Sequence, residues 1–186
     1  MSKETTKSLP LRTRHIEQYL KGIGIDIGAG DDPLPLPGVE TWDWSNGDAN
    51  LMSGAKLCYY DYVYSSHCLE HMYNIKEVLK TWSKLLKPGG YMFTVVPDWE
   101  LYEKCMWPSK FNGDHKHTFS TKFTKEDVGR SNHFHIEDIK LLFNIIQMEL
   151  IEFGVEDLNY DYDKGNIDQT SGNALSQIYF VGKKFL

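Results

Sequence analysis

The chain has 186 residues, 41% of them hydrophobic and 25% charged, an ordinary globular composition that excludes global disorder and favours one compact domain over residues 1–186. Twenty Lys and Arg residues stand against 26 Asp and Glu residues, a formal net charge of −6. This balance disfavours binding to nucleic acid or to an anionic membrane, because both require a basic face. A small neutral or cationic ligand fits the charge better.

The cysteines and the first residues indicate the compartment. Cys58, Cys68 and Cys105 are odd in number and show no CxxC spacing, which argues against a disulfide framework and a cysteine zinc site. Residues 1–10 are polar and lack the apolar stretch of a signal peptide, and no window approaches the roughly 18 apolar residues of a membrane span. We therefore expect a cytoplasmic protein with no membrane partner.

Short strands separated by turns are predicted after an N-terminal helical segment. Within residues 1–21, apolar side chains from position 10 onward recur at helical spacing, and Ile23, Ile25 and Ile27 then predict a buried strand bounded by glycines. Further strands are predicted over 39–42 and 61–66, with a weak apolar run at 55–59 between them.

The clearest helix is predicted to begin after Asn74. Asn74 and Glu77 form an N-cap signature, apolar residues follow at three- and four-residue spacing as far as Leu86, and the Pro88-Gly89-Gly90 sequence stops the pattern. A strand over 91–96 comes next. This alternation of strands and helices predicts an α/β fold with a parallel sheet.

The second half of the chain first loses its periodicity. Residues 98–135 are rich in aromatic residues and histidine, which is typical of a lid or a substrate-side insertion. A helix is predicted from Ile136, and strands over 150–155 and 178–181. We expect a three-layer Rossmann-like domain with a mostly parallel sheet of six or seven strands, whose last strand is antiparallel.

A glycine-rich turn and an acidic residue are the first candidates for chemistry. Asp26-Ile27-Gly28-Ala29-Gly30 ends the first predicted strand, where glycines let backbone N–H groups approach a ligand. Asp43 ends the next strand, fifteen positions beyond Gly28, and is suited to accept two hydrogen bonds from ribose hydroxyls. Either feature alone also fits an ordinary turn, but together they favour a nucleoside site.

The chain resembles class I S-adenosylmethionine-dependent methyltransferases in segments that keep the family's order and spacing over about residues 22–98. The matching segments are 25–30, Asp43, 47–49, 60–71, 85–90 and 91–97. A short first crossover and the 115–120 segment are similar to a subgroup of small bacterial and phage methyltransferase-like proteins with a type 11-like domain. The resemblance implies S-adenosylmethionine as cofactor and methyl transfer to an oxygen or nitrogen nucleophile of a small-molecule or glycan-type acceptor.

The resemblance also implies roles for individual positions. The glycine turn at 28–30 would lie under the methionine and ribose portions of the cofactor, and Asp43 would bind the ribose hydroxyls. Residues 48–49 would flank the adenine, and residues 65–67, at the end of a later strand, would border the sulfonium. His71 would face the substrate. The implied cofactor residues are Asp26, Gly28, Ala29, Gly30, Asp43, Trp44, Asp48, Ala49, Ser65, Ser66 and His67.

The first crossover departs from the family pattern. Only residues 31–38 separate the glycine turn from the next strand, whereas a parallel crossover normally needs about 10 to 12 residues. Prolines 33, 35 and 37 favour extended chain, so we expect the first crossover helix to be truncated or missing. NAD and FAD are disfavoured, because their pyrophosphate needs a helix N-terminus and Asp31 and Asp32 stand in its place.

The histidines allow two other interpretations. His67-x-x-Glu70-His71 spells an inverted zinc-protease motif, which makes a zinc-dependent hydrolase an alternative, although the motif follows a strand instead of lying inside a helix. We therefore predict no metal. A non-catalytic cofactor-binding protein, in which the histidines of the 98–135 segment only close the fold, is the other alternative.

The candidate acid–base residues are His71, His115 and His117, because an imidazole titrates near neutral pH and can take the proton of an attacking hydroxyl or amine. Asp98 or Glu100 is the expected orienting partner. The alternating pairs His115/His117 and His133/His135 also fit half of a metal site or ordinary polar loop residues.

Overall fold

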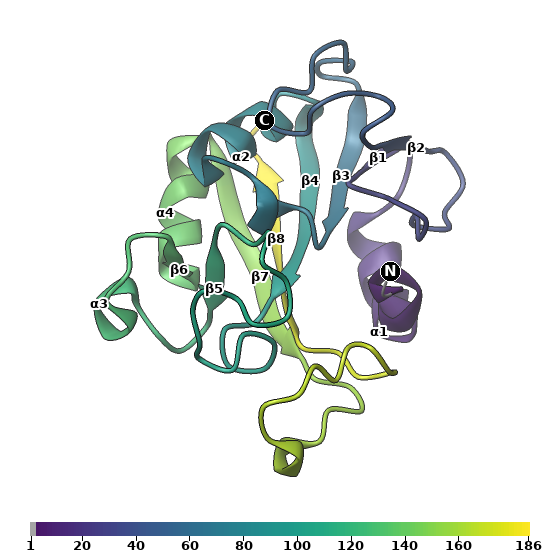
Figure 1. The fold of residues 1–186 in the computed structure, drawn as a ribbon. Helices are drawn as coiled ribbons and strands as arrows, with labels where there is room; N and C mark the ends of the chain where they lie inside the picture. Colours follow the sequence, from purple (N-terminus) through teal and green to yellow (C-terminus); the bar gives the residue numbers. More distant parts are fainter. Residues whose placement is uncertain (1–2) are drawn as a thin grey trace.

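The computed structural model describes residues 3–186 and contains a six-stranded sheet in the order β2-β1-β3-β4-β8-β7 (Figure 1). β1, β2, β3 and β4 run parallel, and β8 is antiparallel to both β4 and β7. The predicted mostly parallel sheet with an antiparallel last strand is confirmed. The strands are β1 (Gly24–Ile27), β2 (Val39–Trp42), β3 (Tyr60–Ser66), β4 (Leu86–Pro97), β7 (Met148–Glu156) and β8 (Gln177–Lys184).

Helices on the two faces of the sheet make three layers. α2 (Ile75–Ser83) and α4 (Ile136–Ile145) pack on one face, and α1 (Glu4–Tyr19) packs on the other. Side chains alternate between the faces along a strand, so in β3 Val63 enters the α2/α4 layer whereas Tyr62 and Tyr64 enter the α1 layer. The predicted Rossmann-like architecture is therefore confirmed.

α2 begins as its sequence predicts but ends earlier. The Asn74 side chain accepts a hydrogen bond of 3.2 Å from the backbone N–H of Glu77, which caps the helix. The helix stops at Ser83, and β4 already begins at Leu86 because Leu86 pairs with Tyr60 of β3. Sheet pairing thus prevails over the helical pattern in this segment.

α1 begins at Glu4, six residues before the predicted helix, and contains Pro10. Its buried side chains are largely polar, with Arg12 fully buried against Glu156 and the Lys7 ammonium 2.8 Å from the carbonyl oxygen of Thr170. Hydrophobic periodicity does not reveal such a face. None of the helices within residues 3–186 is both long and apolar enough to cross a membrane.

A loop replaces the first crossover helix, as the prolines predict. Residues 28–38 contain no helix, and Leu34 is buried in the layer that contains α1. The backbone N–H of Leu34 donates a hydrogen bond of 2.8 Å to the carboxylate of Asp26, which ties the loop to β1. The weak apolar run at 55–59 forms turns and not a strand.

The 98–135 segment is more ordered than its sequence predicts. It contains β5 (Thr118–Ser120), α3 (Lys125–Val128) and β6 (His133–His135), and β5 pairs with β6 in parallel. His133 contacts the hydroxyl of Thr118 and the carbonyl of Phe123, and the His135 ring contacts the carbonyl of Thr121. These two rings are therefore held by local partners.

Candidate active site

A cavity of about 380 Å³ lies at the carboxyl ends of β1 and β3. Parallel sheets bind ligands at this edge, and the volume is within the usual range of about 300–1,000 Å³ for ligand sites. The walls come from the start of α1, the glycine turn and crossover loop, the end of β3 with the following 3-10 turn, the 98–135 segment, and Thr170. Segments distant in sequence thus build one site.

The glycine turn forms the floor of the cavity and depends on Gly28. Gly28 has a φ of +79°, and a Cβ atom built on it would lie 2.5 Å from the Cβ atom of buried Cys68. Its N–H donates a hydrogen bond of 2.8 Å to the carbonyl of Trp42, the last residue of β2. Only glycine satisfies both the backbone conformation and this close approach. Ala29 and Gly30 also line the cavity.

Asp26 lines the cavity below the turn and is 1% exposed. Burial raises the pKa of its carboxyl to about 7, and the charges of Asp32 and Asp43 act in the same direction, whereas the hydrogen bond from Leu34 opposes them. The group therefore changes charge near neutral pH inside the cavity.

The elevated pKa of Asp26 predicts a pH-dependent stability. Between about pH 4 and pH 7 the unfolded chain loses this proton and the folded chain keeps it, so the free energy of unfolding decreases as the pH rises through this window. Asp26→Asn is expected to match the natural protein near pH 4 and to exceed its stability at pH 8 by up to about 4 kcal/mol. Urea denaturation measures the free energy of unfolding of both proteins at pH 4 and at pH 8. A difference between the two proteins that is the same at both pH values would contradict this prediction.

The end of β3 contributes two of its three expected residues to the cavity. Ser65 is fully buried and donates a hydrogen bond of 3.0 Å to the carbonyl of Ile27, so its side chain braces β1 against β3 instead of lining the cavity. Ser66 lines the cavity, and its buried Oγ atom has no hydrogen-bond partner within residues 3–186. His67 also lines it, with a φ of +54° and its Nε2 atom 2.8 Å from the side-chain oxygen of Gln177.

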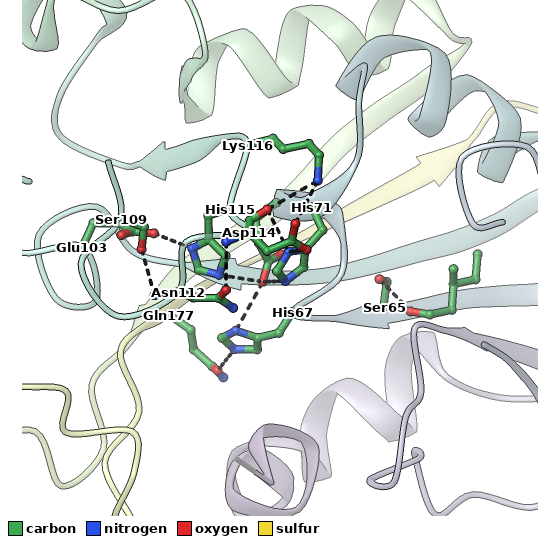
Figure 2. Close-up of polar contacts among 12 residues, drawn as sticks. Ser65, His67, His71, Glu103, Ser109, Asn112, Asp114, His115, Lys116 and Gln177 are labelled. Carbon is green, nitrogen blue, oxygen red and sulfur yellow. Dashed lines mark hydrogen bonds and ion pairs between the residues drawn. The ribbon is translucent and has the colours of Figure 1, made fainter. Parts of the chain in front are cut away.

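Glu70, His71 and His115 also line the cavity. The rings of His71 and His115 lie next to each other in Figure 2. The rings of His71 and His115 are 4.9 Å apart, and Glu103 approaches the Nδ1 atom of His115 at 2.6 Å. Burial opposes the charge of His115, but the hydrogen bond that its ring donates to Glu103 and the charge of Glu70 outweigh burial and raise its pKa.

Glu103 is therefore the orienting partner of His115, in place of the expected Asp98 or Glu100. The carboxylate of Asp98 instead accepts hydrogen bonds of 2.8 Å from the N–H groups of Glu100 and Leu101 and holds the turn after β4. His117 is not among the cavity residues; its ring packs on Phe134, with the centroids 5.5 Å apart.

The residues expected around the nucleoside lie beyond the cavity. Ile27 pairs with Trp42, so Gly28 and Asp43 follow neighbouring parallel strands at the same edge. Trp44 is 87% exposed, Asp48 accepts a hydrogen bond of 2.8 Å from the N–H of Asn50, and the carbonyl of Ala49 accepts one from Trp82. Asp43, Trp44, Asp48 and Ala49 do not line the cavity.

Negative charge dominates the cavity. Of the described lining residues, five are carboxylates and Lys3 is the sole lysine or arginine. Such a cavity attracts a cationic ligand and repels a phosphate. The carboxylates are Glu4, Asp26, Asp31, Asp32 and Glu70.

Several residues that line the cavity are not predicted from the sequence. Glu4 and Thr5 come from α1, Tyr102 and Asn112 from the 98–135 segment, and Thr170 from the loop before β8. No motif marks them, because they reach the cavity only through tertiary contacts.

The mostly parallel sheet, its antiparallel last strand and the glycine turn after β1 agree with the expected fold of class I S-adenosylmethionine-dependent methyltransferases. Residues 12–144 match a family described as "Methyltransferase domain", and the chain belongs to this family. It is therefore an S-adenosylmethionine-dependent methyltransferase, and family and fold imply binding of this cofactor.

Solved structures show the same fold. A methyltransferase from Archaeoglobus fulgidus aligns with a TM-score of 0.57 and 17% identity over 98% of this chain and 95% of that one. A methyltransferase from Thermotoga maritima aligns with a TM-score of 0.53 and 18% identity over 88% of this chain and 83% of that one. The YcgJ protein of Bacillus subtilis aligns with a TM-score of 0.60 and 12% identity over 97% of this chain and 99% of that one. No curated protein sequence matches the chain. These similarities concern the fold alone.

Proposed function

We propose that the protein transfers the methyl group of S-adenosylmethionine to an oxygen or nitrogen nucleophile of a small-molecule or glycan-type acceptor, and that the acidic cavity beside the glycine turn is where this occurs. The observation that carries the proposal is the charge of this cavity, which suits a sulfonium and an ammonium group. S-adenosylmethionine supplies an electrophilic methyl group that a nucleophile displaces in line.

The cavity residues fit such a cofactor. The backbone of the turn at Gly28 leaves space above β1, and the unpartnered hydroxyl of Ser66 offers a hydrogen bond. Glu70 places a carboxylate on one side, and Asp26, whose pKa burial raises to about 7, adds a second negative charge above neutral pH. The ribose and adenine would extend from this cavity across the neighbouring end of β2, toward Asp43.

The protein would act mainly by positioning the reactants. Correct alignment of nucleophile and methyl group can contribute about 7–11 kcal/mol, whereas proton transfer contributes about 10²- to 10⁴-fold in rate. The nucleophile would lie at the end of the cavity formed by His71 and His115, and its proton would leave there. The 98–135 segment, which supplies Tyr102, Asn112 and His115, would form the substrate-side wall.

The geometry gives little support to a zinc hydrolase built on the His67-x-x-Glu70-His71 motif. His67 follows β3 in a left-handed conformation and residues 69–71 form a 3-10 turn, so the motif is not part of an α-helix.

Replacement of Asp43 tests the nucleoside part of the site. Asp43→Ala is expected to weaken binding of S-adenosylmethionine and S-adenosylhomocysteine by about 10- to 100-fold in calorimetry, because hydrogen bonds to a charged group contribute about 1.5–3 kcal/mol. Asp43→Asn, which keeps the shape and one acceptor, should give an intermediate loss, and Glu149→Ala, on the exposed side of β7, should give none.

Unchanged affinity in Asp43→Ala would contradict the placement of the ribose. Turnover is measured separately with a panel of hydroxyl and amine acceptors. Binding of the cofactor without transfer to any of them would favour the non-catalytic alternative.

A further inference from the structure

Three histidine rings, those of His67, His71 and His115 in Figure 2, surround one oxygen of the Glu70 carboxylate. The Oε1 atom lies 3.6 Å from Nδ1 of His67, 3.8 Å from Nε2 of His71 and 3.9 Å from Nε2 of His115. Glu70 is 1% exposed, and neither of its oxygens has a hydrogen-bond partner in the described part of the chain. A buried carboxylate without partners is strongly unfavourable in a folded protein, so this arrangement calls for a positive group at its centre.

Each of the three rings is oriented by an oxygen atom on its outer side. A neutral imidazole that donates its N–H outward to an oxygen presents an unprotonated nitrogen inward, and this is how metal-binding histidines are held in proteins. The outer contacts are His67 Nε2 to Gln177 (2.8 Å), His71 Nδ1 to Asp114 (3.1 Å) and His115 Nδ1 to Glu103 (2.6 Å).

We propose that Glu70, His71 and His115 bind a divalent transition-metal ion. One ligand atom from each of the three lies within 4.8 Å of the others. In a tetrahedral site with bonds of about 2.1 Å the ligands are roughly 3.4 Å apart, so small side-chain movements complete the geometry. Two imidazoles and one carboxylate form the ligand set of catalytic zinc and ferrous sites, which keep positions open for substrate.

The open positions would face the cavity, because all three ligands line it. This step rests on the proposed function: an acceptor bound in the cavity could reach the open positions of the ion. We therefore infer that the acceptor is a hydroxyl compound whose oxygen coordinates the ion. Coordination would release the hydroxyl proton to solvent; the oxygen would then form the O–CH₃ bond while the S–CH₃ bond breaks and its electron pair returns to sulfur. His71 and His115 would thus act through the metal ion instead of as free bases.

Titration of metal-free protein with Zn²⁺ by calorimetry, and with Co²⁺ by visible absorption, tests the site without cofactor or acceptor. A single ion should bind per chain. Glu70→Gln and His115→Gln should each weaken the Kd more than about 100-fold, since in metalloproteins even the loss of a residue that only hydrogen-bonds a ligand weakens metal binding about 10- to 100-fold. His135→Gln, outside the cluster, should leave the Kd unchanged.

Thermal melts show whether each variant is folded. Zn²⁺ should raise the Tm of the natural protein and of His135→Gln, and it should not raise that of Glu70→Gln or of His71→Gln, whose half-buried ring makes it the mildest change. A natural protein that binds Zn²⁺ no tighter than about 10 µM would overturn the proposal. So would a Glu70→Gln variant that binds as tightly as the natural protein.

Binding of S-adenosylhomocysteine in the same samples separates the two proposals. If the protein binds this nucleoside but not Zn²⁺, the metal site is wrong and the proposed methyl transfer stands. If it binds Zn²⁺ in the Glu70-dependent manner but not the nucleoside, the metal site stands and the proposed cofactor site is wrong.

Discussion

Gly28→Ala is expected to abolish measurable binding of S-adenosylmethionine and to lower the free energy of unfolding by about 2–5 kcal/mol. Its φ of +79° is strained for alanine by about 1–2 kcal/mol, and the added methyl group would overlap buried Cys68, an overpacking that adds about 1–3 kcal/mol. Relief of this overlap requires the turn to move away from β3, and the turn is the proposed cofactor floor. Calorimetry and urea denaturation measure the two effects.

Two variants separate the overlap from the backbone strain. Gly129→Ala has a similar φ of +70° but no atom within 4 Å of the new Cβ, so it should show only the backbone strain and normal cofactor binding. Adding Cys68→Gly to Gly28→Ala removes the two overlapping atoms, Cβ and Sγ of Cys68, and should restore part of the binding. Normal cofactor affinity in Gly28→Ala would show that the turn is not the cofactor floor.

Arg12→Met is expected to destabilise the protein by about 3–5 kcal/mol, because it leaves the buried carboxylate of Glu156 without its cation. The guanidinium group is fully buried, pairs with both oxygens of Glu156 and lies 4.9 Å from the centroid of the Phe93 ring. It anchors α1 to β7. Urea denaturation at neutral pH is the measurement.

Arg14→Met is the matched control, because Arg14 is largely exposed and pairs with Glu152 on the same two elements. It should change stability by less than about 1 kcal/mol. The double variant Arg12→Met/Glu156→Leu should recover much of the loss, since it removes both buried charges. Equal effects of Arg12→Met and Arg14→Met would show that burial of the pair is unimportant.

Local sequence signals account for the parallel core of the fold. Isoleucines at alternate positions predicted β1, the Asn74 cap predicted the start of α2, and the prolines before β2 predicted that no helix fills the first crossover. Each of these features is decided by residues close together in the chain. The boundary between α2 and β4 was misplaced because pairing with β3 determines it.

The same distinction applies to the candidate site. The glycine turn follows from its residues and its place after a strand, and Ser66 and His71 follow from the resemblance to a family; all three line the cavity. Glu103 and the start of α1 could not be found, because no spacing rule connects them to the glycine turn. His115, His71 and Glu70 are each named from the sequence, but only the structure shows that these three side chains lie together.

β8 lies between β4 and the edge strand β7, so residues 177–184 join β7 to the parallel part of the sheet. While the ribosome is still translating these residues, at about 5–20 residues per second, the nascent chain has β4 without its neighbour and presents an unpaired, apolar strand edge. Such an edge promotes aggregation. Synthesis at low temperature or together with holdase chaperones should therefore raise the yield of folded protein, and termination before residue 177 should yield inclusion bodies.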